Sequence, residues 1–217
     1  FVREREWQAA QSVTLWVDAG RSMGFSGGRD RPEKGARARL IALALAALLL
    51  RGGERVGLAG AERVAPGTGR AQLLHLAEFM AAQPECEHER IDLASLKDGS
   101  RAVLLSDFLD DPEPVESAVS AAAGRGVGGA MVQILDPVEE EFPFGGRTIF
   151  ESMAGAMRHE TRQARDLRAR YLERLAMRKD RLADLARRSG WQYHSHDTGK
   201  PALTALTWAY HALERGR

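Results

Sequence analysis

The sequence has one cysteine, no long apolar run and almost no net charge, and each of these absences excludes a class of protein. The single thiol, Cys86, cannot form an intramolecular disulfide and is typical of a reducing compartment, which favours a cytoplasmic location. The longest apolar run, residues 40–50, has 11 residues, whereas a membrane-spanning helix needs about 20. The 31 basic and 30 acidic residues nearly cancel, so no overall charge attracts the chain to nucleic acid or to an anionic membrane.

The length of the chain is enough for one α/β core and short for two. We therefore expect a single domain over residues 1–217. The sequence does not begin with methionine but opens on FVREREW, which indicates the interior of a longer chain. We expect an N-terminal segment to precede it, and the sequence does not indicate what that segment does.

Three apolar segments of the chain each end at an aspartate. They are residues 13–18, 102–107 and 130–136. A short apolar run of this kind predicts a strand that is buried on both faces, with the carboxylate at its C-terminal end. In a parallel sheet these ends share one edge, which is where open α/β sheets bind ligands. We therefore expect Asp18 and Asp107 to approach each other.

Strand and helix signals alternate along the chain, which favours an α/β fold with a doubly wound, mainly parallel sheet and helices on both faces. We expect about six strands, with residues 13–18 central and a hairpin over residues 55–65 at or near an edge. Residues 40–50 are apolar on every side and should be buried against the sheet. Further helices are expected over residues 33–51, 71–82, 115–124, 160–188 and 202–213, and further strands over residues 101–107, 128–135, 147–150 and 192–194.

Several segments, in this order, resemble the bacterial domain-of-unknown-function 58 family, which has a von Willebrand factor A-like domain. They are VREREW at residues 2–7, RGGER at 51–55, LLSDF at 104–108, LDPVE at 135–139 and PFGG at 143–146. The resemblance covers essentially the whole chain. It implies a protein–protein interaction module rather than an enzyme, with a MoxR-type AAA+ ATPase as partner in a chaperone-like or complex-maturation role.

In A-type domains a metal-ion-dependent adhesion site binds a divalent cation through side chains of three loops, and an acidic side chain of the partner completes the shell. Oxygen-only ligands of this kind suit Mg²⁺. The resemblance implies four metal ligands in this chain: Asp18, Ser22, Thr68 and Asp107. The first serine of the Asp-x-Ser-x-Ser loop is replaced by Gly20, which has no side-chain oxygen. Weak metal binding and a degenerate, metal-free site are therefore alternatives.

The same residues also have structural explanations. Asp18 and Asp107 are placed to cap the turns that follow their strands, and Thr68 lies in the turn sequence Pro-Gly-Thr-Gly. An enzymatic alternative is a Mg²⁺-dependent phosphohydrolase that uses Asp18 and Asp107. Such an enzyme places a second acidic residue near the first aspartate and a lysine on a later strand, and the sequence predicts neither.

Three other features of the sequence are compatible with a functional site or with an ordinary structural role. His194 and His196 lie on one face of an extended segment, which is compatible with zinc or with a solvated loop. Cys86 has no base at an identifiable spacing, so we expect an ordinary thiol rather than a nucleophile. The basic helix expected within residues 158–188 is either an amphipathic helix on the sheet or a docking surface for an acidic partner. It lacks the interleaved aromatic residues that stack nucleic-acid bases.

Overall fold

The core of the protein is a six-stranded sheet with the order β3-β2-β1-β4-β5-β8. The computed structural model describes residues 10–60, 63–89, 91–143, 148–151, 158–161 and 164–214. All neighbouring strands of this sheet run parallel except β2 and β3, which are antiparallel. The strands are β1 (Ser12–Val17), β2 (Arg55–Ala59), β3 (Val64–Gly67), β4 (Arg101–Ser106), β5 (Gly128–Leu135) and β8 (Gln192–Asp197).

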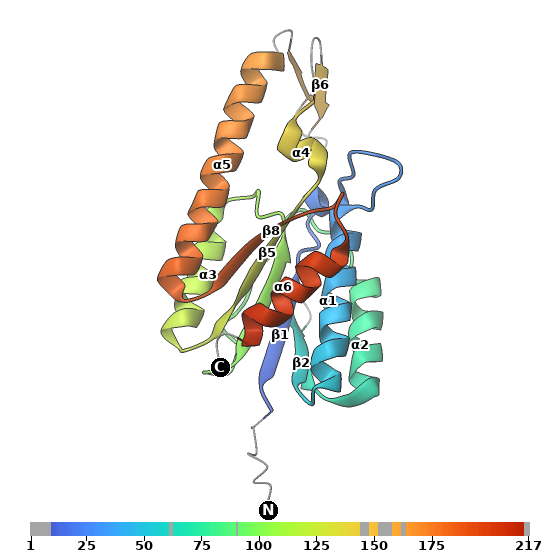
Figure 1. Cartoon of the computed structure of the whole chain (residues 1–217), viewed down its shortest axis with the longest axis vertical. Helices are drawn as coiled ribbons and strands as arrows, with labels where there is room; N and C mark the ends of the chain where they lie inside the picture. Colours follow the sequence, from blue (N-terminus) through green and yellow to red (C-terminus); the bar gives the residue numbers. More distant parts are fainter. Residues whose placement is uncertain are drawn as a thin grey trace, which may run out of the picture.

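Helices cover both faces of this sheet (Figure 1). One face packs against α1 (Lys34–Arg51), α2 (Gly69–Ala82) and α6 (Ala202–Glu214), and the other against α3 (Pro112–Gly124) and α5 (Ala164–Ser189). The period-2 alternation of strands divides β1 between the two layers, because Leu15 points to the first and Trp16 to the second. This is the doubly wound architecture that the alternating sequence pattern predicts, and it is consistent with the von Willebrand factor A-like fold that the family resemblance implies.

Helix α1 is less buried than its sequence predicts. Its inner face is closed, since Ile41 and Leu45 are at most 1% exposed. Leu40 and Leu48, however, are 56% and 41% exposed, so the expectation that residues 40–50 are buried on every side is wrong. The reason is geometric: α1 contacts the sheet, α2 and α6, and one side of the helix remains open to solvent.

The predicted hairpin is confirmed at one edge of the sheet, where β3 pairs only with β2. The strand expected over residues 147–150 does not join the main sheet. Residues 148–150 lie in β6 (Thr148–Glu151), which pairs with β7 (Arg158–Thr161) in a separate two-stranded antiparallel sheet, and residue 147 lies outside the described residues. The long helix consequently starts at Ala164 rather than at residue 160.

The parallel strands β1, β2, β4, β5 and β8 end at one edge of the sheet, called the lip below. Two short helices lie there: η1 (Arg21–Gly24), which follows β1, and α4 (Pro137–Glu141), which follows β5. Neither short helix is among those that the sequence predicts. In Figure 1, α4, β6 and the first half of α5 extend beyond the lip. Within the described ranges, no helix is both long and apolar enough to cross a membrane.

Candidate functional site

Two of the strand-end aspartates meet at the lip, as predicted. Strands β1 and β4 are parallel neighbours with Val17 opposite Leu105, so Asp18 lies beside the last residues of β4. The Asp18 backbone N–H donates to the Leu105 carbonyl at 3.0 Å. The Ser106 hydroxyl donates to Oδ2 of Asp18 at 2.5 Å. Asp18 and Asp107 are both buried, at 7% and 1% exposure, and their carboxylates are near enough to interact electrostatically.

Asp18 is a buried carboxylate without a cation. Its Oδ1 accepts from the backbone N–H of Gly20 at 2.8 Å. Among the described residues, no basic side chain lies within ion-pair distance of it. Burial therefore raises the pKa of Asp18 to about 6, against the lowering effect of the hydrogen bonds from Ser106 and Gly20. The charges of Asp107 and Asp110 raise the pKa further.

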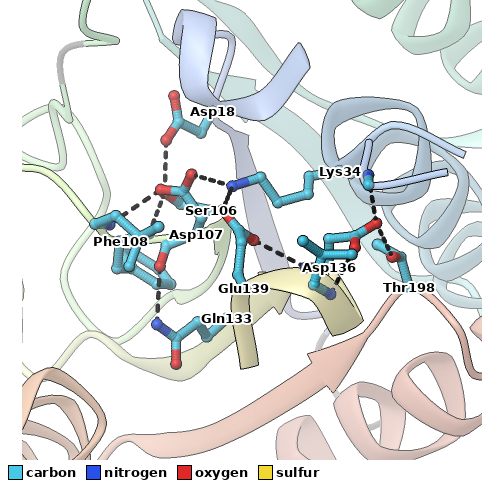
Figure 2. A network of polar contacts seen from close by, with 12 residues as sticks. Asp18, Lys34, Ser106, Asp107, Phe108, Gln133, Asp136, Glu139 and Thr198 are labelled. Carbon is cyan, nitrogen blue, oxygen red and sulfur yellow. Dashed lines mark hydrogen bonds and ion pairs between the residues drawn. The ribbon is translucent and has the colours of Figure 1, made fainter. Parts of the chain in front are cut away.

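Asp107, in contrast, is paired with a buried lysine (Figure 2). Lys34, the first residue of α1, donates from Nζ to Oδ2 of Asp107 at 2.8 Å and to Oε1 of Glu139 at 2.7 Å. Its side chain is 1% exposed. Burial lowers the pKa of Lys34, but the carboxylates of Asp107 and Glu139 outweigh this effect and raise the pKa above its ordinary value. Lys34 is therefore a permanent cation, and we call these three residues the Lys34 triad.

The third strand-end aspartate, Asp136, holds the remaining loops of the lip together. It has no exposed surface. Its oxygens accept from the backbone N–H groups of Gly27 and Val138 at 3.0 and 2.9 Å and from the Thr198 hydroxyl at 3.3 Å. The guanidinium of Arg31 approaches Oδ2 at 3.3 Å. Asp136 also caps α4 in a capping box with Glu139, so it joins the loops after β1, β5 and β8 (Figure 2).

The two predicted hydroxyl ligands lie at opposite ends of the sheet. Ser22 is in η1, near Asp18 in sequence and at the lip. Thr68 follows Gly67, which pairs with Val56, and Val56 in turn pairs with Val13 at the start of β1. Asp18 therefore lies about 16 Å farther along the strand direction. The expectation that Thr68 lies close to the carboxylates is wrong, because the antiparallel β3 returns the chain to the other end of the sheet.

The segment around Cys86, which follows α2, lies at the lip, where the family resemblance implies Thr68. Cys86 forms an isolated parallel bridge with Gly20. Its carbonyl accepts from the Arg21 N–H at 3.0 Å, and its N–H donates to the Ala19 carbonyl at 3.2 Å. The Cys86 thiol donates to Glu89 at 3.2 Å. Burial and the adjacent Glu89 raise the pKa of Cys86 to about 12, which fits an ordinary protonated thiol.

A cleft of about 230 Å³ opens beside Asp18, between the lip, α3 and α5. Its walls combine acidic groups with an apolar surface. Asp18, Asp110 and Asp111 contribute carboxylates, Arg178 of α5 contributes a guanidinium, and the apolar lining includes Trp16, Ile91, Phe108, Val115 and Leu182. Asp110 is exposed at this cleft and accepts from His88 at 2.9 Å. The cleft therefore has a buried carboxylate and an apolar wall on one side and exposed charged groups on the other.

The donor set at the lip does not fit a Mg²⁺ shell. Gly20 contributes no oxygen, Thr68 is remote, and Oδ2 of Asp107 is occupied by the ammonium of Lys34. Oδ1 of Asp107 accepts from the Leu109 N–H at 3.0 Å. Among the residues described, no group of three or more His, Cys, Asp or Glu side chains is arranged to hold a metal ion. Of the four expected ligands only Asp18 and Ser22 remain, so water would have to supply most of the roughly six oxygens that Mg²⁺ requires.

The two histidines of β8 have structural partners instead of a shared metal. His194 stacks on Trp208, with 4.9 Å between the ring centroids. Nε2 of His196 lies 2.9 Å from Nη1 of Arg37. A guanidinium only donates, so this nitrogen of His196 acts as the acceptor and is not available to zinc. The expected solvated loop is also wrong, because both rings lie in β8 and His196 is buried.

Comparison with known proteins places the fold and the family. No curated protein matches the chain. A conserved hypothetical protein BatB from Bacteroides thetaiotaomicron superimposes with a TM-score of 0.54 and 10% identity, over 95% of this chain and 98% of that one. An aerotolerance-related membrane protein from Bacteroides fragilis NCTC 9343 gives a TM-score of 0.55 and 10% identity, over 95% and 100%. These similarities establish a shared fold. The family model described as "Protein of unknown function DUF58" matches residues 1–181, and the chain belongs to this family.

Proposed function

We propose that the chain is a non-catalytic protein–protein interaction module of the von Willebrand factor A type, and that it binds its partner at the lip. The observation that carries this proposal is the cleft beside Asp18, where a buried carboxylate and an exposed acidic rim adjoin an apolar wall. Interfaces combine these features, since an apolar centre supplies affinity and rim charges select the partner.

The family resemblance supports a MoxR-type AAA+ ATPase as the partner, in a chaperone-like or complex-maturation role. An ATPase of this kind supplies the energy of such a reaction, so the module itself needs only to bind. The basic helix α5 contributes Arg178 to the same cleft, which extends the proposed contact surface from the lip onto that helix.

The alternative, a Mg²⁺-dependent phosphohydrolase, receives less support. A lysine does reach the lip, from the start of α1 rather than from a strand, but its ammonium is held between two carboxylates. It is therefore poorly placed to bind a phosphate. The Cys86 thiol is protonated at neutral pH because its pKa is raised to about 12, so it is no nucleophile.

The test compares matched charge removals at the two ends of the sheet. Asp110 lines the cleft, and Asp98 precedes β4 at the other end. Their side chains are 53% and 77% exposed, and among the described residues each forms an ion pair with one basic side chain. We expect Asp110→Asn to weaken binding of the partner ATPase about fivefold, the effect of about 1 kcal/mol at an interface rim. Asp98→Asn should leave binding unchanged in biolayer interferometry.

Two further variants complete the test. Asp18→Ala should weaken association more than Asp110→Asn, whereas Thr68→Ala, on an exposed residue at the far end of the sheet, should have no effect. Equal losses for Asp110→Asn and Asp98→Asn would place the contact elsewhere. Turnover of a phosphate ester that disappears in Asp18→Ala would replace this proposal by the phosphohydrolase.

A further inference from the structure

The ammonium of Lys34 occupies the centre of the lip. It lies 2.8 Å from Asp107, which follows β4, and 2.7 Å from Glu139 in α4. The partners are 73 and 105 residues away in sequence, so three distant segments converge on one nitrogen (Figure 2). The ring of Phe25 lies below the ammonium, with its centroid at 5.6 Å.

Each carboxylate of the Lys34 triad is engaged at both oxygens. The second oxygen of Asp107 accepts from the Leu109 N–H at 3.0 Å, and the second oxygen of Glu139 accepts from the Asp136 N–H at 2.9 Å. A charge buried at this depth is tolerated only when it is paired and hydrogen-bonded. All three members of the triad meet this condition without any further ion.

A divalent cation cannot share this position at low cost. A metal on Oδ2 of Asp107 would sit within about 5 Å of the Lys34 ammonium, in a region with little water to screen the repulsion. Lys34 is 1% exposed, and its ammonium is held by both carboxylates. Metal binding at Asp107 and the ion pair with Lys34 therefore exclude each other.

The first loop points to the same conclusion independently. A Cβ atom at Gly20 would stand 3.0 Å from Oδ1 of Asp18. The Asp18 carboxylate thus folds back over its own loop and binds the Gly20 N–H at 2.8 Å. A serine at this position would require the Asp18 carboxylate to shift by a few tenths of an ångström.

We propose that Lys34 is the resident cation of the lip: its ammonium takes, at Asp107, the place of a divalent metal, and the lip is consequently metal-independent. The triad joins α1, the end of β4 and α4, so the lip is assembled by folding rather than by ion binding. A partner then recognises a fixed surface, and its binding does not follow the concentration of divalent cations.

The first experiment measures metal binding on the intact chain. Calorimetric titration of the wild-type protein with MgCl₂ and MnCl₂ should show no binding tighter than millimolar, and thermal unfolding in 10 mM of either salt should match unfolding in EDTA. Submillimolar binding that disappears in Asp107→Asn would overturn the proposal. This readout does not involve the partner, so it fails or succeeds separately from the proposed function.

The second experiment removes the resident cation. Lys34→Met keeps the length of the side chain but leaves Asp107 and Glu139 facing each other without a charge between them. We expect a lower melting temperature that MnCl₂ raises by several degrees, together with new binding of at least tenfold higher affinity than in the wild type. A folded Lys34→Met protein without any response to metal would contradict the proposal.

A third variant covers the case in which Lys34→Met does not fold. The double variant Lys34→Met/Glu139→Gln removes one positive and one negative charge together, so it should fold better than the single variant. The double variant has one carboxylate fewer, so MnCl₂ should raise its melting temperature less than that of Lys34→Met. If only the double variant folds, MnCl₂ should still raise its melting temperature more than that of the wild type. If MnCl₂ changes the melting temperature of the double variant no more than that of the wild type, Lys34 does not exclude a metal ion from Asp107.

Discussion

The hydroxyl of Ser106 lies between Asp18 and Phe108 and serves both. It donates to Oδ2 of Asp18 at 2.5 Å, and the same oxygen accepts from the Phe108 N–H at 2.9 Å. Phe108 has a φ of 50°, in the left-handed region that only a few per cent of such residues adopt. The bond from Ser106 therefore stabilises an unfavourable turn and, at the same time, the buried charge of Asp18.

Ser106→Ala is expected to destabilise the protein by about 2–3 kcal/mol, since it removes two buried hydrogen bonds and leaves the Phe108 N–H without an acceptor. It should also raise the pKa of Asp18 above its value of about 6, because Ser106 bonds to the ionised form. Chemical denaturation and NMR titration of the Asp18 carboxyl measure the two effects.

Ser100→Ala is the matched control for this variant. Ser100 immediately precedes β4 at the other end, is also buried, and donates one hydrogen bond to the Lys97 carbonyl at 2.6 Å. Its loss should cost about 1 kcal/mol and leave the pKa of Asp18 unchanged. Equal destabilisation by both variants would mean that the Ser106 oxygen does not support the turn at Phe108.

The sequence predicts the position of Asp18 and Asp107 but not their partners. An apolar run that ends in aspartate is a local pattern, and it predicts a strand with a carboxylate at its C-terminal end. Because β1 and β4 are parallel neighbours, their two aspartates lie at the same edge. The partner of Asp107 is different: Lys34 is a lysine in the first turn of a helix, and Glu139 is one of three consecutive glutamates. Both look like surface residues in sequence. Lys34 and Glu139 are buried because α1 and α4 pack at the lip. This packing joins distant parts of the chain, so no local sequence pattern predicts it.

The misplacement of Thr68 has a cause that was visible in the sequence. A hairpin over residues 55–65 already implies that the chain reverses direction, so the turn that follows β3 lies at the starting end of the parallel strands. The family resemblance implies a second-loop hydroxyl near the carboxylates, but the strand directions place Thr68 at the other end of the sheet. The segment around Cys86, after the next helix, is the part of the chain that returns to the lip.

Asp18 should make the protein less stable at neutral than at acidic pH. Its pKa is raised from 3.8 to about 6 in the folded state, so between these values the folded protein binds more protons than the unfolded chain. Stability therefore falls as pH rises from about 4 to 6 and is constant above that range. The shift corresponds to a cost of about 3 kcal/mol at pH 7.

Asp18→Asn removes this cost. It should raise the free energy of unfolding at pH 7.5 by up to about 3 kcal/mol and have little effect at pH 4, where Asp18 is already protonated. Urea denaturation across this range measures the difference. Asp98→Asn changes an exposed carboxylate, so its effect on the free energy of unfolding should not vary with pH over the same range. A destabilising effect of Asp18→Asn at pH 7.5 would show that the ionised form is favourable in the fold.

His196 should give a pH dependence of the opposite sign. It is 2% exposed, and burial, together with the adjacent Arg37, lowers its pKa to about 4. Between this value and the ordinary 6.5, the unfolded chain binds more protons than the folded protein, so stability falls as pH decreases through this window. The loss at pH 4 amounts to about 3 kcal/mol.

These two groups offset each other between pH 4 and 6, so the wild-type profile is expected to be shallow there. His196→Gln, which keeps an acceptor for Arg37 but does not titrate, should remove the acid-labile component and leave stability rising toward pH 4. Asp18→Asn should remove the opposite component, so the stability of this variant should fall as pH decreases toward 4. Parallel slopes for the two variants in the same urea series would contradict the assignment of the two groups.

Asp136 is expected to be the most damaging position at the lip for stability. It is fully buried, and it accepts from three donors that belong to different loops. Asp136→Ala removes the acceptor of the N–H groups of Gly27 and Val138 and the ion pair with Arg31. The expected loss is about 3–5 kcal/mol, the range found when one partner of a buried charged pair is removed.

Two variants separate the contributions at Asp136. Thr198→Ala removes only the 3.3 Å contact and should cost about 1 kcal/mol or less. Gly27→Ala leaves every acceptor in place, but its Cβ would stand 2.5 Å from both Oδ1 of Asp136 and a methyl group of Val138, so the first loop must move away. We expect Gly27→Ala to lower the free energy of unfolding nearly as much as Asp136→Ala. In the double variant the two losses should be far from additive, because both break the same connection between loops. Fully additive losses would mean that Gly27 and Asp136 act independently, and that the first loop is held at the lip by other contacts.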